Sequence, residues 1–154
     1  MTSAIDTRLA ELGITLPEAA TPAANYVPFV RVGDLLHVSG QVPFVDGKLS
    51  PGKLGDTMTT EEGAAVARLC AMHLLAQVRK ACDGDLDRLV RVIKLVGFVN
   101  STADFGEQPK VVNGASDFMV DVLGDKGRHA RSAVSAASLP FGVAVEVEGI
   151  FQIS

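Results

Sequence analysis

The 154-residue chain has no tryptophan, one tyrosine and seven phenylalanines, so aromatic residues make up only 5% of it. Apolar residues still account for 47% and charged residues for 21%, a balance that excludes an intrinsically disordered chain. With few aromatics, the core must consist mainly of valine, leucine, alanine and isoleucine, which favours helices packed closely on a sheet. The length predicts a single domain over residues 1–154.

The chain also has no excess of basic residues. Fourteen lysines and arginines stand against eighteen acidic residues, giving a net charge of -4, which disfavours nucleic acid as a partner. No apolar run approaches the roughly 18 to 20 residues that cross a bilayer, and the first residues, MTSAIDTRLAELG, lack the basic and apolar regions of a signal peptide. We therefore expect a cytoplasmic protein that does not interact with membranes.

Cysteine is scarce as well, with two residues, Cys70 and Cys82. Both fall in one predicted helix, where twelve residues correspond to about 18 Å of axial rise. That separation prevents a disulfide within the chain. Two buried thiols in a reducing compartment are expected.

The first half of the chain predicts a short helix, paired strands and a long helix. Ile5, Leu9 and Leu12 recur at helical spacing after a capping Thr2 or Ser3, within an N-terminal extension over residues 1–22. Residues 26–45 carry two β-rich runs around a Gly-Asp turn, and a second turn at residues 46–47 leads back, as in an antiparallel meander. Thr59 or Thr60 with a following glutamate then opens a helix that extends to about residue 82.

The second half predicts a strand at Leu89–Val99, a helix at Asp104–Leu123 and two strands at residues 130–139 and 143–153. The helices carry apolar stripes that suit packing on one face of a sheet. The order of elements predicts an α+β fold, with a mixed β-sheet and two helices on one face.

The most specific local pattern is Arg131, in the run His129-Ala130-Arg131-Ser132, followed fifteen residues later by Glu146. We expect the two residues on neighbouring antiparallel strands joined by the Pro140-Phe141-Gly142 turn, where they could pair or flank one pocket. One interpretation is a structural ion pair. The other is a guanidinium that binds a carboxylate beside a carboxylate that accepts a proton from water.

Other site types have little support in the sequence. The three histidines, at positions 37, 73 and 129, show no metal-binding spacing, so neither a metal nor another cofactor is expected. Ser132 lies beside His129, but adjacent strand residues point to opposite faces, so a structural role is favoured over a nucleophilic one.

Two segments nevertheless carry a family resemblance: Ser39-Gly40-Gln41-Val42-Pro43, and Ala130-Arg131-Ser132 continuing through Leu139-Pro140 to Val145-Glu146. The chain resembles the Rid/YjgF family of reactive-intermediate deaminases, also described as endoribonuclease L-PSP or translation-inhibitor proteins. The resemblance spans roughly residue 23 to the C-terminus. It implies a chorismate-mutase-like fold, a homotrimeric barrel and ligand clefts between subunits that suit small carboxylates.

The resemblance also implies roles for individual residues. Arg131 matches the arginine that holds the substrate carboxylate, and Glu146 matches the acid that positions or activates water. Tyr26 matches an aromatic of the cleft, and a shifted alignment offers Phe29 instead. At the position where many relatives have a cysteine this chain has Ala133, which argues against thiol-dependent chemistry there.

Three further positions complete the implied site. Asn113 falls at a ligand-site asparagine if one residue is inserted before Arg131. Ser39 and Gly40 fall where the backbone approaches the ligand.

Three functions follow from these expectations. The first is hydrolytic deamination of small 2-imino or enamino acids to 2-oxo acids and ammonia, without a cofactor, because orientation and one general base suffice for imine hydrolysis. The second is non-catalytic binding or sensing of a 2-oxo acid or related carboxylate. The third is ribonuclease activity, which the acidic charge and the lack of a catalytic histidine pair disfavour.

Overall fold

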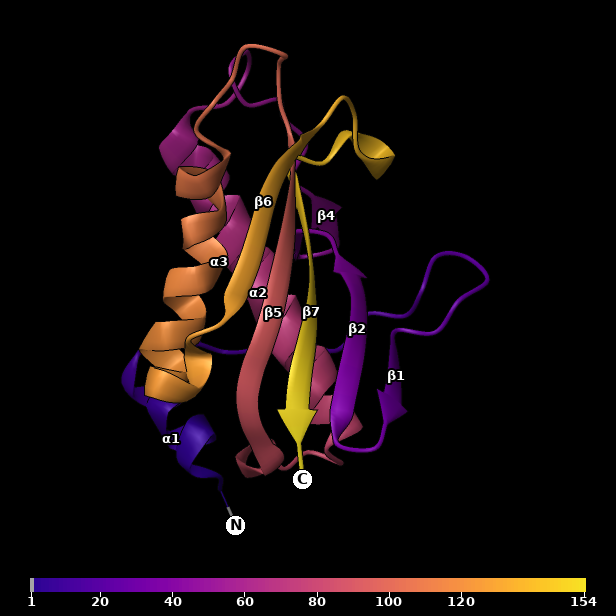
Figure 1. Cartoon of the computed structure of the whole chain (residues 1–154), viewed down its shortest axis with the longest axis vertical. Helices are drawn as coiled ribbons and strands as arrows, with labels where there is room; N and C mark the ends of the chain where they lie inside the picture. The colour runs from indigo at the N-terminus through magenta and orange to yellow at the C-terminus, as the bar shows by residue number, and fades with distance from the viewer. Residues whose placement is uncertain (1) are drawn as a thin grey trace.

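The computed structural model describes residues 2–154 and shows one mixed β-sheet covered by helices (Figure 1). Within these residues the sheet has five strands. In spatial order they are β1 (Phe29–Val32), β2 (Leu35–Gln41), β7 (Val145–Ile153), β5 (Leu89–Asn100) and β6 (Ala130–Ala136). The β5–β6 pair is parallel and the other neighbours are antiparallel.

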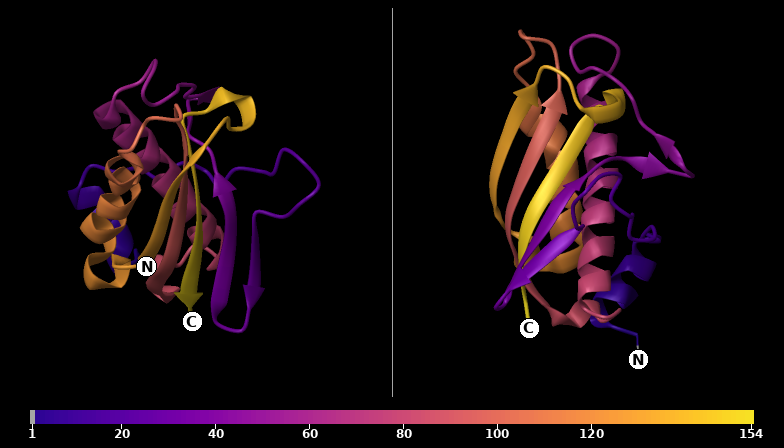
Figure 2. Two further views of the ribbon diagram at one scale, coloured as in Figure 1. Left: turned by 45° about the horizontal axis from the view of Figure 1, so that its top comes forward. Right: turned by 90° about the vertical axis from the view of Figure 1, so that its right-hand side faces the viewer.

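The two long helices, α2 (Thr60–Ala81) and α3 (Gln108–Leu123), cover one face of the sheet, and the short helix α1 (Ala4–Glu11) lies beside α3 (Figure 2). Short 3-10 turns, η1 (Leu86–Arg88), η2 (Gly124–Gly127) and η3 (Pro140–Gly142), connect the elements. No helix in the described chain covers the opposite face, which we call the open face. The α+β fold with helices on one side is confirmed.

Local sequence signals explain where the helices begin. The Thr59 side chain accepts a hydrogen bond from the Glu62 backbone, and the Glu62 side chain accepts one from the Thr59 backbone, forming a capping box. Ser3 caps α1 by accepting a hydrogen bond from the Asp6 backbone N–H. Both helix starts confirm the prediction, whereas α3 begins at Gln108, four residues after the expected Asp104.

A glycine permits the close packing of α2 on α3. A Cβ atom added to Gly114 would lie 1.9 Å from the Ala64 carbonyl oxygen, a distance that no side chain tolerates. The two helices therefore approach until backbone meets backbone, and they pack into a core of buried aliphatic residues that includes Val111, Val112 and Phe118.

The strand order corrects two expectations. β6 and β7 are not neighbours, because β5, α3 and β6 form a parallel crossover unit that places β6 against one edge of β5, and β7 pairs with the other edge. The strands β3 (Phe44–Val45) and β4 (Lys48–Leu49) confirm the expected turn at residues 46–47, but they form a separate hairpin, so the meander within the main sheet ends after β2.

The remaining expectations concern helix length and the thiols. No helix in residues 2–154 is long and apolar enough to span a membrane. Cys70 and Cys82 are both buried and free, as predicted.

Candidate functional site

Arg131 lies on β6 and its guanidinium contacts the neighbouring helix α3. Nη1 donates to Asn113 Oδ1 at 2.8 Å and to Ser116 Oγ at 3.2 Å, and Nη2 donates to the Pro109 carbonyl at 3.3 Å. All three acceptors are neutral, and among residues 2–154 no salt bridge involves this guanidinium. Its positive charge is therefore held in place and available to an anionic ligand.

His129 forms a second set of hydrogen bonds, which fixes the position of Ser116. His129 Nδ1 lies 2.5 Å from the Gly127 carbonyl oxygen, which can only accept, so Nδ1 carries the proton. Nε2 of the neutral ring then accepts from Ser116 Oγ at 2.8 Å. Burial lowers the pKa of His129, and the positive charge of Arg131 acts in the same direction. The neutral histidine therefore fixes the hydroxyl that accepts from Arg131.

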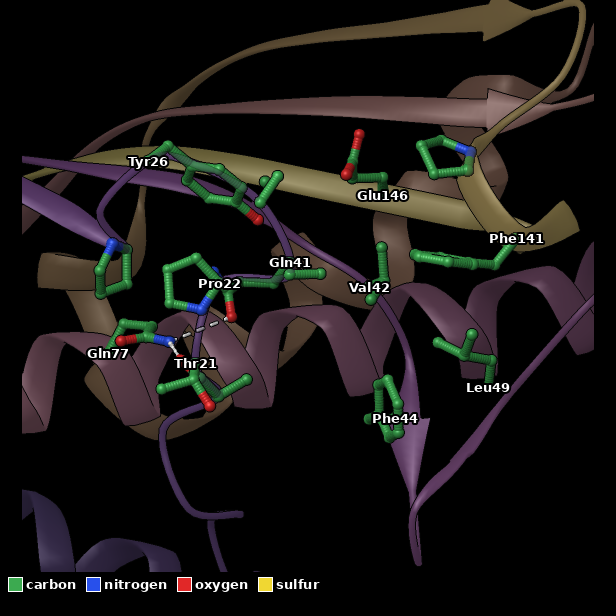
Figure 3. Close-up of a pocket in the computed structure, with 16 residues that line it drawn as sticks. Thr21, Pro22, Tyr26, Gln41, Val42, Phe44, Leu49, Gln77, Phe141 and Glu146 are labelled. Carbon is green, nitrogen blue, oxygen red and sulfur yellow. Dashed lines mark hydrogen bonds between the residues drawn. The ribbon is translucent and has the colours of Figure 1, made fainter.

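Glu146 lines a cavity of about 490 Å³, here called the Glu146 cavity (Figure 3). Its walls come from the segment before β1, from the end of β2 and the β3–β4 hairpin, from α2 and from η3. The lining residues are Ala20, Thr21, Pro22, Ala23, Ala24, Tyr26, Pro28, Gly40, Gln41, Val42, Phe44, Leu49, Gln77, Pro140, Phe141 and Glu146.

The Glu146 carboxyl group is the ionisable centre of this cavity. Burial raises its pKa, and the nearby Glu148 carboxylate raises it further. A Cβ atom on Gly40 would lie 2.8 Å from Glu146 Cδ, so a side chain at this bulge of β2 would displace the carboxyl group from its present position. A carboxyl with a raised pKa can exchange protons closer to neutral pH than an ordinary glutamate.

The two candidate aromatic residues, Tyr26 and Phe29, lie in different surroundings. Tyr26 lines the Glu146 cavity and is 51% exposed. Phe29 is partly buried and packs against the hydrophobic core instead. Of the two, Tyr26 is the one in contact with the cavity.

Ser39 and Gly40 occupy different surroundings although they are adjacent. Gly40 lines the Glu146 cavity, whereas Ser39 lines a hollow on the open face with Lys94 and Glu148, and its hydroxyl donates to the Val27 carbonyl at 2.9 Å. Ser39 therefore fixes the chain before β1 rather than facing the cavity.

Arg131 and Glu146 do not meet within one chain, which corrects the expectation of neighbouring strands. In the sheet register Arg131 lies opposite Leu95, and Glu146 lies opposite Phe98. Leu95 and Phe98 are three residues apart on β5, so their side chains point to opposite faces. The Arg131 and Glu146 side chains thus lie on opposite faces of the sheet, with β5 between the two strands, and an ion pair within the chain is excluded.

Several residues of the site were missed from the sequence. Ser116 follows Asn113 by three residues on α3, a spacing that places both on one helix face, and this signal could have found it. Gln77 is a buried amide within the apolar stripe of α2. Phe141 was expected only as part of a turn.

A metal site is not formed by the described residues: among residues 2–154 no group of three or more histidine, cysteine, aspartate or glutamate side chains could hold an ion.

Comparison with known proteins identifies the class. Residues 6–148 match the family model described as "YjgF/chorismate mutase-like, putative endoribonuclease". Because the match covers most of the chain, the protein belongs to the YjgF/chorismate mutase-like family.

Individual relatives span nearly the whole chain. Protein TCP17 of Trypanosoma cruzi is 52% identical over 148 residues, covering 95% of this chain and 92% of its own. The crystal structure of Atu1372 from Agrobacterium tumefaciens, a protein of unknown function, is 50% identical with a TM-score of 0.91, covering 97% of this chain and 92% of its own. A protein of Shewanella oneidensis described as a putative endoribonuclease is 35% identical with a TM-score of 0.93, covering 97% of this chain and 99% of its own.

Proposed function

We propose that the protein hydrolyses 2-imino or enamino acids to 2-oxo acids and ammonia, in a cleft between two subunits of a homotrimer. The observation that carries the proposal is the pair of complementary groups: a carboxyl with a raised pKa in an apolar cavity, and an arginine held by neutral acceptors only. An imino acid presents a carboxylate and an electrophilic carbon, which these two groups suit.

The open face of the sheet supports the trimer. Val30, Val32 and Val134 on this face are 51%, 65% and 45% exposed, and Val96 and Ile150 line a hollow there. An apolar sheet face normally packs against something. Further copies of the chain could cover this face, and a ligand that contacts both Arg131 and Glu146 would have to lie between two subunits, since one chain does not bring them together.

The reaction needs no cofactor. Arg131 binds the carboxylate of the imino acid with two parallel N–H groups. Glu146 accepts a proton from water while the water oxygen bonds to the imine carbon, giving a tetrahedral carbinolamine. With the imine nitrogen protonated at the outset, this carbinolamine is neutral, and Glu146 then gives its proton to the nitrogen. As the C–N bond breaks, the hydroxyl proton passes back to Glu146, so that the 2-oxo acid, ammonia and one proton leave.

Binding of a 2-oxo acid without turnover is the second candidate. It is favoured by the position of Arg131, whose contacts with Asn113 and Ser116 are complete without Glu146. The family description of an endoribonuclease is not carried over, because the net charge is -4 and nucleic acid binding requires basic surfaces.

Ammonia release tests the proposal. Imines are generated in situ by an amino-acid oxidase, and the rate is compared with spontaneous hydrolysis. We expect the wild-type protein to exceed the spontaneous rate and Glu146→Gln to lower kcat by about 100-fold, the usual contribution of a general base. The control is Glu148→Gln, the same glutamate-to-glutamine change two residues later on β7. We expect this variant to retain activity at pH 8. If the wild-type rate equals the spontaneous rate for every imine while 2-oxo acids still bind through Arg131, the deaminase proposal is refuted. Sensing of a 2-oxo acid then takes its place.

A further inference from the structure

The Glu146 cavity is larger and more apolar than a small imino acid requires. Its volume of about 490 Å³ lies in the range of roughly 300 to 1,000 Å³ typical of pockets for drug-sized ligands. Apart from Glu146, the apolar part of the lining includes Pro22, Tyr26, Val42, Leu49 and Phe141. The reacting end of a three-carbon acid would leave most of this apolar surface uncovered.

Two amide side chains of the cavity donate hydrogen bonds within the chain. Gln77 is 1% exposed, and its Nε2 donates to the Ala20 carbonyl at 2.8 Å. Gln41 is 7% exposed, and its Nε2 donates to the Ser39 carbonyl at 2.9 Å. Gln77 Oε1 is buried and has no hydrogen-bond partner among the described residues, so this acceptor remains within a lining that is otherwise mostly apolar.

The N-terminal segment is a fixed wall of the cavity. Residues 20–24 line it, and the Gln77 hydrogen bond to Ala20 holds this segment on α2. Upstream, Asp87 accepts from the Ala4 backbone N–H at 2.9 Å, and Leu16 is buried in the core. The cavity therefore keeps a defined shape on this side.

Phe141 forms the opposite end of the cavity, with Glu146 between it and Tyr26 (Figure 3). Its backbone has φ 60° and ψ 13°, the left-handed conformation that bulky residues rarely adopt. The residue is 70% exposed, so packing within the described chain does little to compensate for this strain. A strained residue at the edge of a cavity points to a role in ligand binding.

Building on the proposed function, we propose that Phe141 is a specificity-determining residue and that the substrates carry a bulky apolar side chain, aromatic or branched. The reacting carbon lies at Glu146, and the side chain packs between the Phe141 ring and the apolar wall formed by Pro22 and Val42. Contact with the ligand buries the Phe141 ring and provides the packing that the free chain lacks.

Binding of 2-oxo acids tests this inference independently of turnover. Calorimetry compares pyruvate, 4-methyl-2-oxopentanoate and phenylpyruvate. We expect the wild-type protein to bind the two larger acids at least about tenfold more tightly than pyruvate, since burying several carbons gives discrimination of this order. Phe141→Gly should reduce that ratio to about threefold or less without lowering Tm, because glycine adopts a positive φ freely.

Two further variants sharpen the result. Phe141→Leu keeps an apolar side chain and should retain an intermediate preference. Asp46→Gly relaxes another non-glycine residue of positive φ, in the β3–β4 turn, and should leave the preference unchanged. Equal binding of pyruvate and phenylpyruvate, or a preference that survives in Phe141→Gly, would overturn the inference.

The outcomes also separate the inference from the proposed function. A binding preference for large acids without ammonia release would refute deamination and leave the role of Phe141 standing. Ammonia release at equal efficiency from small and large imines would support deamination and overturn the role of Phe141.

Discussion

Arg131 and Glu146 project from opposite faces of one sheet, on strands that β5 separates. Arg131 contacts α3 through Asn113, and Glu146 lies in a cavity formed with the N-terminal segment and η3. A ligand that touches both groups must therefore lie between two chains. This relationship makes the catalytic proposal depend on assembly.

Removing the guanidinium should abolish useful activity. Arg131→Ala is expected to lower kcat/KM by about 30- to 1,000-fold, because a charge-assisted pair of hydrogen bonds to a carboxylate contributes roughly 2 to 4 kcal/mol. Arg131→Lys should recover only part of this, since lysine offers a point charge in place of a planar pair of donors. Steady-state ammonia release measures both changes.

The control for that experiment is Arg128→Ala, at an exposed arginine three residues earlier whose Nε is paired with Asp125. It should leave kcat/KM within about twofold of wild type, as expected for a surface ion pair. An Arg131→Ala variant as active as Arg128→Ala would contradict the role of Arg131 in binding the carboxylate.

Replacing Glu146 should stabilise the fold at neutral pH. Burial raises the pKa of Glu146 above its ordinary value of 4.5, so the ionised form is penalised in the folded chain and not in the unfolded one. Glu146→Gln should therefore raise the free energy of unfolding at pH 7.5. Below pH 4.5 both states carry a protonated carboxyl and the difference should vanish. Urea denaturation at pH 7.5 and at pH 4 measures the free energy of unfolding of both proteins. If Glu146→Gln is less stable relative to wild type at pH 7.5 than it is at pH 4, the prediction is refuted.

Glu148 should set the acid limb of the pH–rate profile. Its carboxylate raises the pKa of Glu146, and a general base must be deprotonated to act. In Glu148→Gln the acid limb of kcat/KM should move to lower pH, with the plateau unchanged. An acid limb at the wild-type position would show that a group other than Glu146 controls it.

Acidification should weaken the support of Arg131. Burial lowers the pKa of His129 below its ordinary value of 6.5, so the unfolded chain binds this proton more readily than the folded one. The stability that the neutral ring contributes is present above pH 6.5 and is lost as the pH falls through the lowered pKa. Once protonated, Nε2 no longer accepts from Ser116.

Thermal denaturation between pH 7.5 and 5 checks this expectation. The wild-type Tm should fall over this interval by more than the Tm of His129→Gln, which has no imidazole to titrate. His37→Gln, at an exposed histidine of β2, is the control. Parallel Tm curves for wild type and His129→Gln would contradict the link between His129 and Ser116.

The helices and most strand positions could be predicted because their signals are local. The capping pair Thr59 and Glu62 and the apolar stripe that follows determine α2 without reference to the rest of the chain. The order of the strands depends on distant pairing instead. The turn between β6 and β7 suggested that they are neighbours, but the crossover through α3 places β6 beside β5.

The candidate site was predictable only where the family resemblance named single residues. Asn113 followed from it, and the structure places this residue on Arg131. Phe141 was not recognised, because the adjacent Gly142 already explains a turn and the positive φ of Phe141 cannot be read from the sequence. The hydrogen bond of Ser116 to His129 depends on the packing of α3 beside β6, which only the folded chain shows.

The most direct test of an intersubunit site is complementation between two inactive variants. Arg131→Ala and Glu146→Gln chains are unfolded together, refolded as a mixture and compared with each variant refolded alone, while native mass spectrometry confirms mixed trimers. If Arg131 and Glu146 of different subunits form each site, random assembly of equal amounts restores both groups at about a quarter of the sites. We therefore predict about a quarter of the wild-type rate of ammonia release. Mixed trimers no more active than the separate variants would contradict a site shared between chains.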